Sequence, residues 1–232
     1  MSMRFQDLKN ARLRLGWGQA EVAERLGVSQ TYVHMLEQGK RRLTPELTRR
    51  LALVYQMSPV ELPITAGFRP SEVDAQWLAE SLAKLDYPGF AYLRSRVAKK
   101  NPGEVLLIAL AQDRLEARLA EALPWLLFRY SEMDVDWLAE QARTHNLQNR
   151  LGFVTGLAVR LSKRDATNAH TTAVLTRLES LLDHSRLVHE DAFPRPPKNN
   201  AEREWLTVNR PPEAAHWNLL TDLRPEHLQY AG

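Results

Sequence analysis

Three polar side chains share one face of a short predicted helix near the start of the chain. In the segment 30–38, Gln30, Thr31 and His34 fall on the outer face, whereas Val33 and Leu36 point inward at helical spacing. Amide, hydroxyl and imidazole groups can form hydrogen bonds with base edges or with phosphate oxygens. The chemistry that this pattern favours is contact with nucleic acid.

A group of basic residues follows this segment. Its members are Lys40, Arg41 and Arg42, with Arg49 and Arg50 nearby. Such a group can be a solvated surface, but beside an outward-facing polar helix we interpret it as a track of phosphate contacts. Residues 1–66 carry a net charge of +4 and residues 67–232 a net charge of −1, so one end of the chain is suited to a polyanion.

Other chemistry has little support. The chain has no cysteine, which excludes disulfides, thiol nucleophiles and cysteine-ligated metals. Residues 71–232 contain no phosphate-binding loop, nucleophile elbow or zinc-protease motif. His184 and His189 have acidic neighbours, but they are spaced five residues apart, which is poor for one helical face. We therefore predict no catalytic residue, no metal, no cofactor and no enzymatic activity.

Length and composition place the chain among ordinary globular proteins. Its 232 residues allow one or two domains, and 44% of them are hydrophobic. The longest apolar run, 105–111, is far below the roughly 20 residues that span a bilayer. The first residues have no apolar signal segment. We expect a cytoplasmic protein with no membrane partner.

Residues 5–62 divide into five predicted helices with clear boundaries. Glycines at 16, 27 and 39 end the first three, while Ser29 and Thr44 are suited to cap the third and fourth. Glu61 completes a capping box for a short fifth helix at 58–61. The predicted segments are 5–15, 18–26, 30–38, 44–55 and 58–61. Prolines at 63 and 70 predict a boundary, so residues 1–66 form the first predicted domain.

These residues resemble the phage repressor/Cro-type (XRE-like) helix-turn-helix family over about residues 5–62. The resemblance is carried by LKNAR at 8–12, GWGQAEVA at 16–23, LGVSQTYV at 26–33 and LEQGKR at 36–41. It implies a five-helix, lambda-repressor-like domain that binds double-stranded DNA, usually as a dimer. One position departs from the family pattern. Gly18 replaces the frequent threonine or serine, so the second helix lacks a side-chain cap.

The resemblance also implies roles for individual residues. The base contacts that it implies are Gln30, Thr31 and His34. Met35 also matches a family position that can face the groove, although methionine is an unusual residue for contact with bases. The backbone contacts that we expect are Gln19, Ser29, Lys40, Arg41 and Arg42. Gln19 would also brace the third helix, and Arg12 and Glu37 would form a structural ion pair between the first and third helices.

The remainder of the chain is predicted to be a larger helical domain over 71–192. We expect a long apolar helix from Asn101 to about Pro124. Gly152 and Gly156, four residues apart, predict close helix packing. From 193 to 232 the chain is rich in proline and aromatic residues, which predicts an extended tail packed on its own domain or on a partner. Trp205 and Trp217 are the candidate anchors for such a partner.

Three functional hypotheses follow. The first is an autoregulating repressor that binds a near-palindromic operator as a dimer. The second is an antitoxin-like protein whose C-terminal domain binds and neutralises a partner protein encoded nearby. The third is a repressor that senses a small molecule, because an apolar pocket among helices leaves little trace in a sequence.

Overall fold

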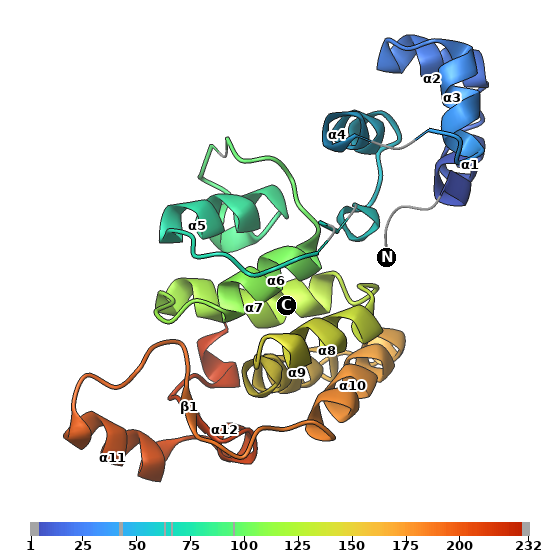
Figure 1. Ribbon diagram of the computed structural model, residues 1–232. Helices are drawn as coiled ribbons and strands as arrows, with labels where there is room; N and C mark the ends of the chain where they lie inside the picture. The colour runs from blue at the N-terminus through green and yellow to red at the C-terminus, as the bar shows by residue number, and fades with distance from the viewer. Residues whose placement is uncertain (1–4, 42–43, 63, 66, 95, 229–232) are drawn as a thin grey trace. The chain divides into compact units, whose positions relative to one another are not determined.

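The computed structural model describes residues 5–41, 44–62, 64–65, 67–94 and 96–228. The chain divides into two compact units, Met1–Phe68 and Arg69–Gly232. Figure 1 shows that each unit is built from helices. Among the described residues, the only strands are two segments of two residues each. The prediction of an all-α fold is confirmed.

The first unit contains all five segments predicted to be helical. They are α1 (Phe5–Arg14), α2 (Gln19–Leu26), α3 (Gln30–Glu37), α4 (Pro45–Val54) and the 3₁₀ turn η1 (Pro59–Glu61). The fifth is thus a single tight turn. Its start is held by the backbone N–H of Ser58, which donates to the Glu61 carboxylate at 2.9 Å.

Local sequence sets the ends of these short helices. The hydroxyl of Ser29 accepts a hydrogen bond from the Tyr32 N–H, and the hydroxyl of Thr44 accepts one from the Leu47 N–H, both at 3.2 Å. Gly27 ends α2 in the left-handed region, with φ +64°. Gly18 provides no side-chain cap for α2. The corner between α2 and α3 therefore depends on a glycine and a serine cap.

The first unit has its own apolar core, to which α1, α2, α3 and α4 all contribute. Leu8, Leu26, Val33 and Leu36 are each 2% exposed or less. Trp17 packs against the edge of this core. Burial of these side chains is what holds four helices of eight to ten residues together, because helices of this length are marginal in isolation.

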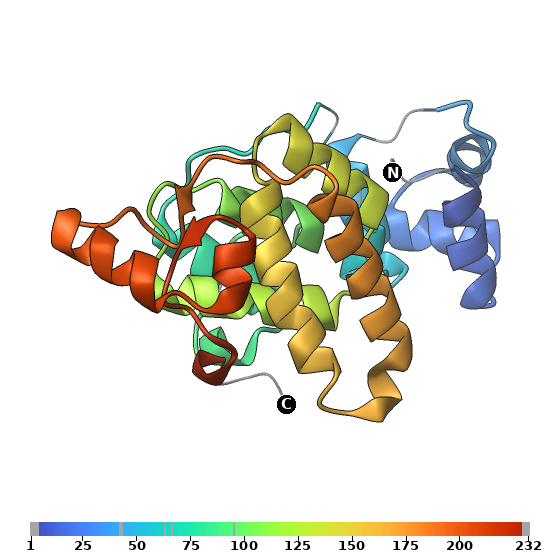
Figure 2. The same cartoon turned by 90° about the horizontal axis from the view of Figure 1, so that it is seen from below.

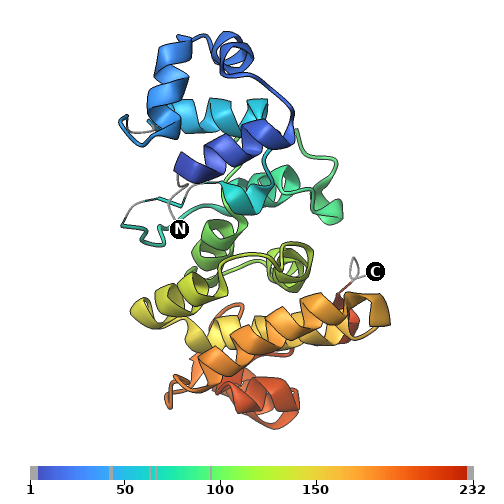
Figure 3. The same cartoon turned by 90° about the vertical axis from the view of Figure 1, so that its right-hand side faces the viewer.

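The second unit is larger and layered around two buried helices. Its main helices are α5 (Ala75–Lys84), α6 (Pro102–Leu110), α7 (Ala117–Arg129), α8 (Val135–Thr144), α9 (Gln148–Ser162) and α10 (Ala169–Asp183). All nine residues of α6 are buried, as are all residues of α9 except Arg150 and Arg160. Figures 2 and 3 show α9 and α10 side by side, and Gly156 lets Glu179 of α10 approach the α9 backbone.

The prediction of one helix from Asn101 to Pro124 is wrong. The chain leaves the helix after Leu110 and re-enters it at Ala117, and Pro124 lies inside α7. The guanidinium of Arg150 donates to the carbonyl oxygens of Leu110 at 2.8 Å and Gln112 at 3.1 Å. In a continuous helix these carbonyls would accept hydrogen bonds from backbone N–H groups one turn further along the chain. Here the side chain of Arg150, from α9, supplies the donors instead.

The tail is less extended than predicted. Residues 200–209 form α11 (Asn200–Asn209), because Asn199 caps it at the Glu202 N–H and it contains no proline. A second short helix, α12 (Pro212–His216), follows. The strands β1 (Asp191–Ala192) and β2 (Leu219–Leu220) pair in parallel and bring the end of the tail back to its beginning.

The two tail tryptophans have different environments. Trp205 is 52% exposed, whereas Trp217 is 1% exposed. The Trp217 ring covers Gly152 so closely that a Cβ at position 152 would overlap it. Trp217 is therefore buried in its own unit, the first of the two alternatives expected for the tail, and it presents no exposed surface to a partner.

We predict that Gly152→Ala destabilises the second unit by about 1–3 kcal/mol, because the added methyl group displaces the Trp217 ring. Urea unfolding and hydrogen exchange of the α9 amides would measure the change. Gly18→Ala adds the same methyl group without overlap and is the control, since no atom lies within 4 Å of a Cβ there. Without the overlap, alanine in a helix would instead stabilise by up to about 1 kcal/mol, and that result would contradict the packing described.

Candidate nucleic-acid interface

The outer face of α3 is polar and open. Gln30, Thr31 and His34 are exposed, whereas Val33 and Leu36 are 2% and 1% exposed. The separation follows from helical geometry, since successive side chains are rotated by about 100°. The helix therefore presents one amide, one hydroxyl and one imidazole away from the core, and Met35 lies half-buried at the edge of this face.

A carboxylate fixes the position of α3 within its unit. Glu37, at the end of α3, accepts hydrogen bonds from Arg12 Nε at 2.6 Å and Arg12 Nη2 at 3.1 Å. Gln19, at the start of α2, donates to the same carboxylate at 2.8 Å. Arg12 also donates to the Trp17 carbonyl at 2.9 Å. One charged group thus joins α1, α2 and α3.

The surroundings of Glu37 keep it ionised. Burial raises its pKa, but the hydrogen bonds from Arg12 and Gln19 and the charges of Arg12 and Lys9 outweigh burial, so the pKa lies below its usual value. The same cluster affects a neighbour. Burial, with the Glu37 charge, raises the pKa of Tyr55 to about 12. Both groups therefore keep a single protonation state near neutral pH.

Cations lie at both ends of the exposed α3 face. Lys40 and Arg41 follow α3 and are exposed. Arg50 of α4 is also exposed, and its guanidinium lies 3.3 Å from the position that a Cβ of Gly27 would occupy, beside the corner between α2 and α3. Arg42 and the side chain of Arg49 fall outside the residues that the structure describes.

Two residues expected at DNA phosphates make contacts inside the unit. Ser29 accepts the bond that caps α3, and the amide nitrogen of Gln19 is bound to Glu37. Sequence reasoning did not single out Arg25, whose guanidinium carbon lies 4.1 Å from the centre of the Trp17 ring and which pairs with Glu21 at 2.9 Å. The spacing of four residues between Glu21 and Arg25 is the sequence pattern that predicts their ion pair on one face of a helix.

Residues 6–63 match the family model described as a helix-turn-helix domain. The chain matches no curated protein and no solved structure. The first unit is thus a helix-turn-helix domain, as its resemblance to the repressor/Cro-type family predicted. Domains of this class place a helix in the major groove of DNA. The class of the first unit therefore implies that it binds DNA.

The second unit has polar groups of a different kind. His, Asp and Glu side chains in the described ranges do not gather in threes as metal ligands would. Every helix in those ranges is too short or too polar to span a bilayer. The polar side chains of α9 instead organise the fold. Asn149 bonds to the backbone N–H and C=O of Leu187, and Arg150 pairs with Asp191 at 2.6 Å.

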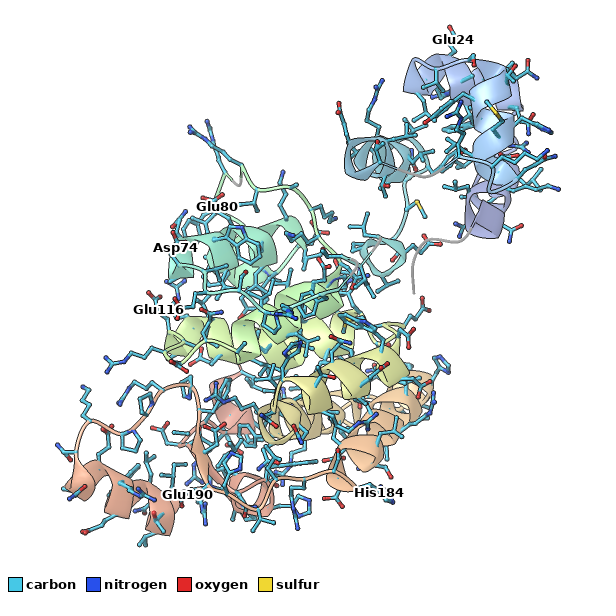
Figure 4. All side chains as sticks on the ribbon, viewed as in Figure 1. Glu24, Asp74, Glu80, Glu116, His184 and Glu190 are labelled. Carbon is cyan, nitrogen blue, oxygen red and sulfur yellow. The ribbon has the colours of Figure 1, made fainter. Side chains whose placement is uncertain are left out.

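We predict that Glu37→Gln lowers the free energy of opening of the first unit by about 1.5–3 kcal/mol at neutral pH, because Arg12 loses its anionic partner while it is still largely buried. Hydrogen exchange of the α2 and α3 amides in the full chain would measure this. Glu24→Gln is the control, since Glu24 is exposed and lies on the outer side of α2 (Figure 4).

The same variant has a signature in acid. Because the folded pKa of Glu37 lies below the usual 4.5, its contribution to stability is complete above that value and is lost as the pH falls through the lower folded value. Glu37→Gln should therefore flatten the acid limb of the stability profile of the first unit. An unchanged acid limb would show that the carboxylate does not hold α3.

Proposed function

We propose that the protein is a sequence-specific transcription regulator, and that it acts as an autoregulating repressor bound as a dimer to a near-palindromic operator. The observation that carries the proposal is the exposed polar face of α3, flanked by cations, in a domain of the helix-turn-helix class. The resemblance to repressor-type domains supports repression as the activity.

In this proposal the residues of α3 contact bases, and the cations that follow α3 contact phosphates. Gln30 and Thr31, on the first turn of α3, would contact base edges, since a glutamine amide can bind adenine through two hydrogen bonds. His34, one turn further, would contact a base or the backbone. Lys40 and Arg41 would bind phosphates, which fixes the register of the domain without reading sequence.

A dimer is supported by the energetics of small DNA-binding domains. One short recognition helix contacts few bases, and a second copy linked to it raises the affinity through effective concentration. Two copies related by a two-fold axis would place their α3 helices about 34 Å apart on one side of the duplex. The proposed operator therefore consists of two inverted half-sites, and a single half-site should bind much more weakly.

We expect the protein to bind DNA covering its own promoter roughly a thousandfold more tightly than scrambled DNA of equal length. The double variant Gln30→Ala/Thr31→Ala should lose about ten- to a hundredfold of the specific affinity and retain the non-specific affinity. Titration of both DNA molecules at two salt concentrations measures the two quantities.

The control for this experiment is the double variant Gln76→Ala/Thr176→Ala. It removes the same side chains from exposed positions of the second unit. Equal weakening of the α3 variant on both DNA molecules would contradict base reading. Equal binding of the wild-type protein to both DNA molecules would contradict autoregulation.

The phosphate contacts have a separate signature. Replacing Lys40 or Arg41 with glutamine should weaken binding to both DNA molecules and reduce the slope of log affinity against log salt by about 0.9 for each phosphate that is no longer neutralised. Lys84→Gln, at an exposed position on α5, is the matched control. An unchanged slope in the Lys40 and Arg41 variants would place the phosphates elsewhere on the domain.

A further inference from the structure

A cavity of about 520 Å³ lies in the second unit, beside the start of α7. Its walls come from the turn before α7, the segment after β1, α11 and the end of β2. Figure 4 shows Glu116, one of the lining residues, at the start of α7. The volume is within the range of small-molecule sites, which is roughly 300–1,000 Å³. None of the residues proposed to contact DNA lines this cavity.

The apolar part of the cavity has a buried floor and an open aromatic edge. Leu115, Leu206 and Leu220 line it and are 7% exposed or less, whereas Trp205 is 52% exposed. A tryptophan costs little conformational entropy to place and offers a large flat surface to a ligand. Trp205 therefore offers an exposed aromatic surface at the edge of the cavity.

Two of the lining charges neutralise each other. Arg195 donates to Glu202 at 2.7 Å, and the backbone N–H of Lys198 donates to the same carboxylate at 2.5 Å. The hydrogen bonds from Arg195 and Lys198 lower the pKa of Glu202 to about 2. This pair is therefore committed to holding the start of α11 and has little capacity left for a ligand.

Three further charges line the cavity, and none forms an ion pair within the described part of the chain. These are Arg114, Glu116 and Asp222, all exposed. Glu116 sits at the N-terminal end of α7, where its charge offsets the positive end of the helix dipole. Arg114 and Asp222 remain as opposite charges on different walls, although Asp222 also lies in the field of Arg195. A ligand with a single charge would satisfy only one of them.

We propose that this cavity binds a small zwitterion with an apolar side chain, of the α-amino acid type. Arg114 pairs with the carboxylate of the ligand, Asp222 pairs with its ammonium group, and Trp205 covers its side chain. The proposal does not rest on DNA binding, because its test reads ligand binding by the full-length protein without DNA.

The test compares three probes with the same side chain: phenylalanine, phenylalanine amide and N-acetylphenylalanine. At about pH 6 these are a zwitterion, a cation and an anion. Calorimetric titration should show that phenylalanine binds at least about tenfold more tightly than either analogue, which is a difference of about 1.4 kcal/mol. The aromatic side chain is the same in all three probes, so differences in affinity arise at the amino and carboxyl ends, where N-acetylphenylalanine also carries an acetyl group.

Variants assign each charge. Asp222→Asn should weaken phenylalanine and the amide but leave N-acetylphenylalanine unchanged, and Arg114→Gln should weaken phenylalanine and N-acetylphenylalanine but leave the amide unchanged. Trp205→Leu should weaken all three probes. Asp113→Asn and Arg143→Gln are the controls, since both residues are exposed and neither lines the cavity.

Three outcomes would overturn the proposal. Tightest binding of the amide would define a cation site, and tightest binding of N-acetylphenylalanine would define an anion site at Arg114 and the α7 terminus. Absence of saturable phenylalanine binding up to about 10 mM would exclude an affinity of even a few kcal/mol for this class of ligand.

Discussion

The orientation of α3 within the first unit depends on one carboxylate. Glu37 receives hydrogen bonds from Arg12 and Gln19, so α1, α2 and α3 meet at a single charged group. Apolar packing alone is tolerant of small rotations between helices, whereas three directed hydrogen bonds to one carboxylate are not. The angle at which α3 presents its polar face is therefore fixed by electrostatics, while the free energy that keeps the helices together comes mainly from the core.

Much of the first unit could be predicted because its determinants are local. Ser29, Thr44 and Gly27 each act within a few residues of their position, and the inward positions of α3 follow from its periodicity. The ion pair between Arg12 and Glu37 could be expected only through a family resemblance, since 25 residues separate the partners. Arg50 belongs to the basic group that the sequence shows, but its position beside Gly27 depends on how α4 packs against the corner between α2 and α3, which no local pattern predicts.

The second unit was harder to predict because its elements end where distant residues intervene. At the break after Leu110, the carbonyl of Leu110 accepts a hydrogen bond from Arg150, which is 40 residues away in the sequence. The helix α11 begins where Asn199 and the pair Arg195–Glu202 allow it, although the surrounding prolines favour an extended chain. Apolar periodicity predicts that a helix exists, but its ends are bound by polar side chains, which are distant in the sequence for α6 and local for α11.

The contact between Gly152 and Trp217 has a consequence for synthesis of the protein. Gly152 is synthesised about 65 residues before Trp217, whose indole covers it. At 5–20 residues per second this separation corresponds to roughly 3–13 seconds of translation. During this interval part of α9 lacks its native cover. The first unit has no such delay, because its core is complete within residues 1–68. The residues that form the core of the first unit are therefore all synthesised before the indole that covers α9.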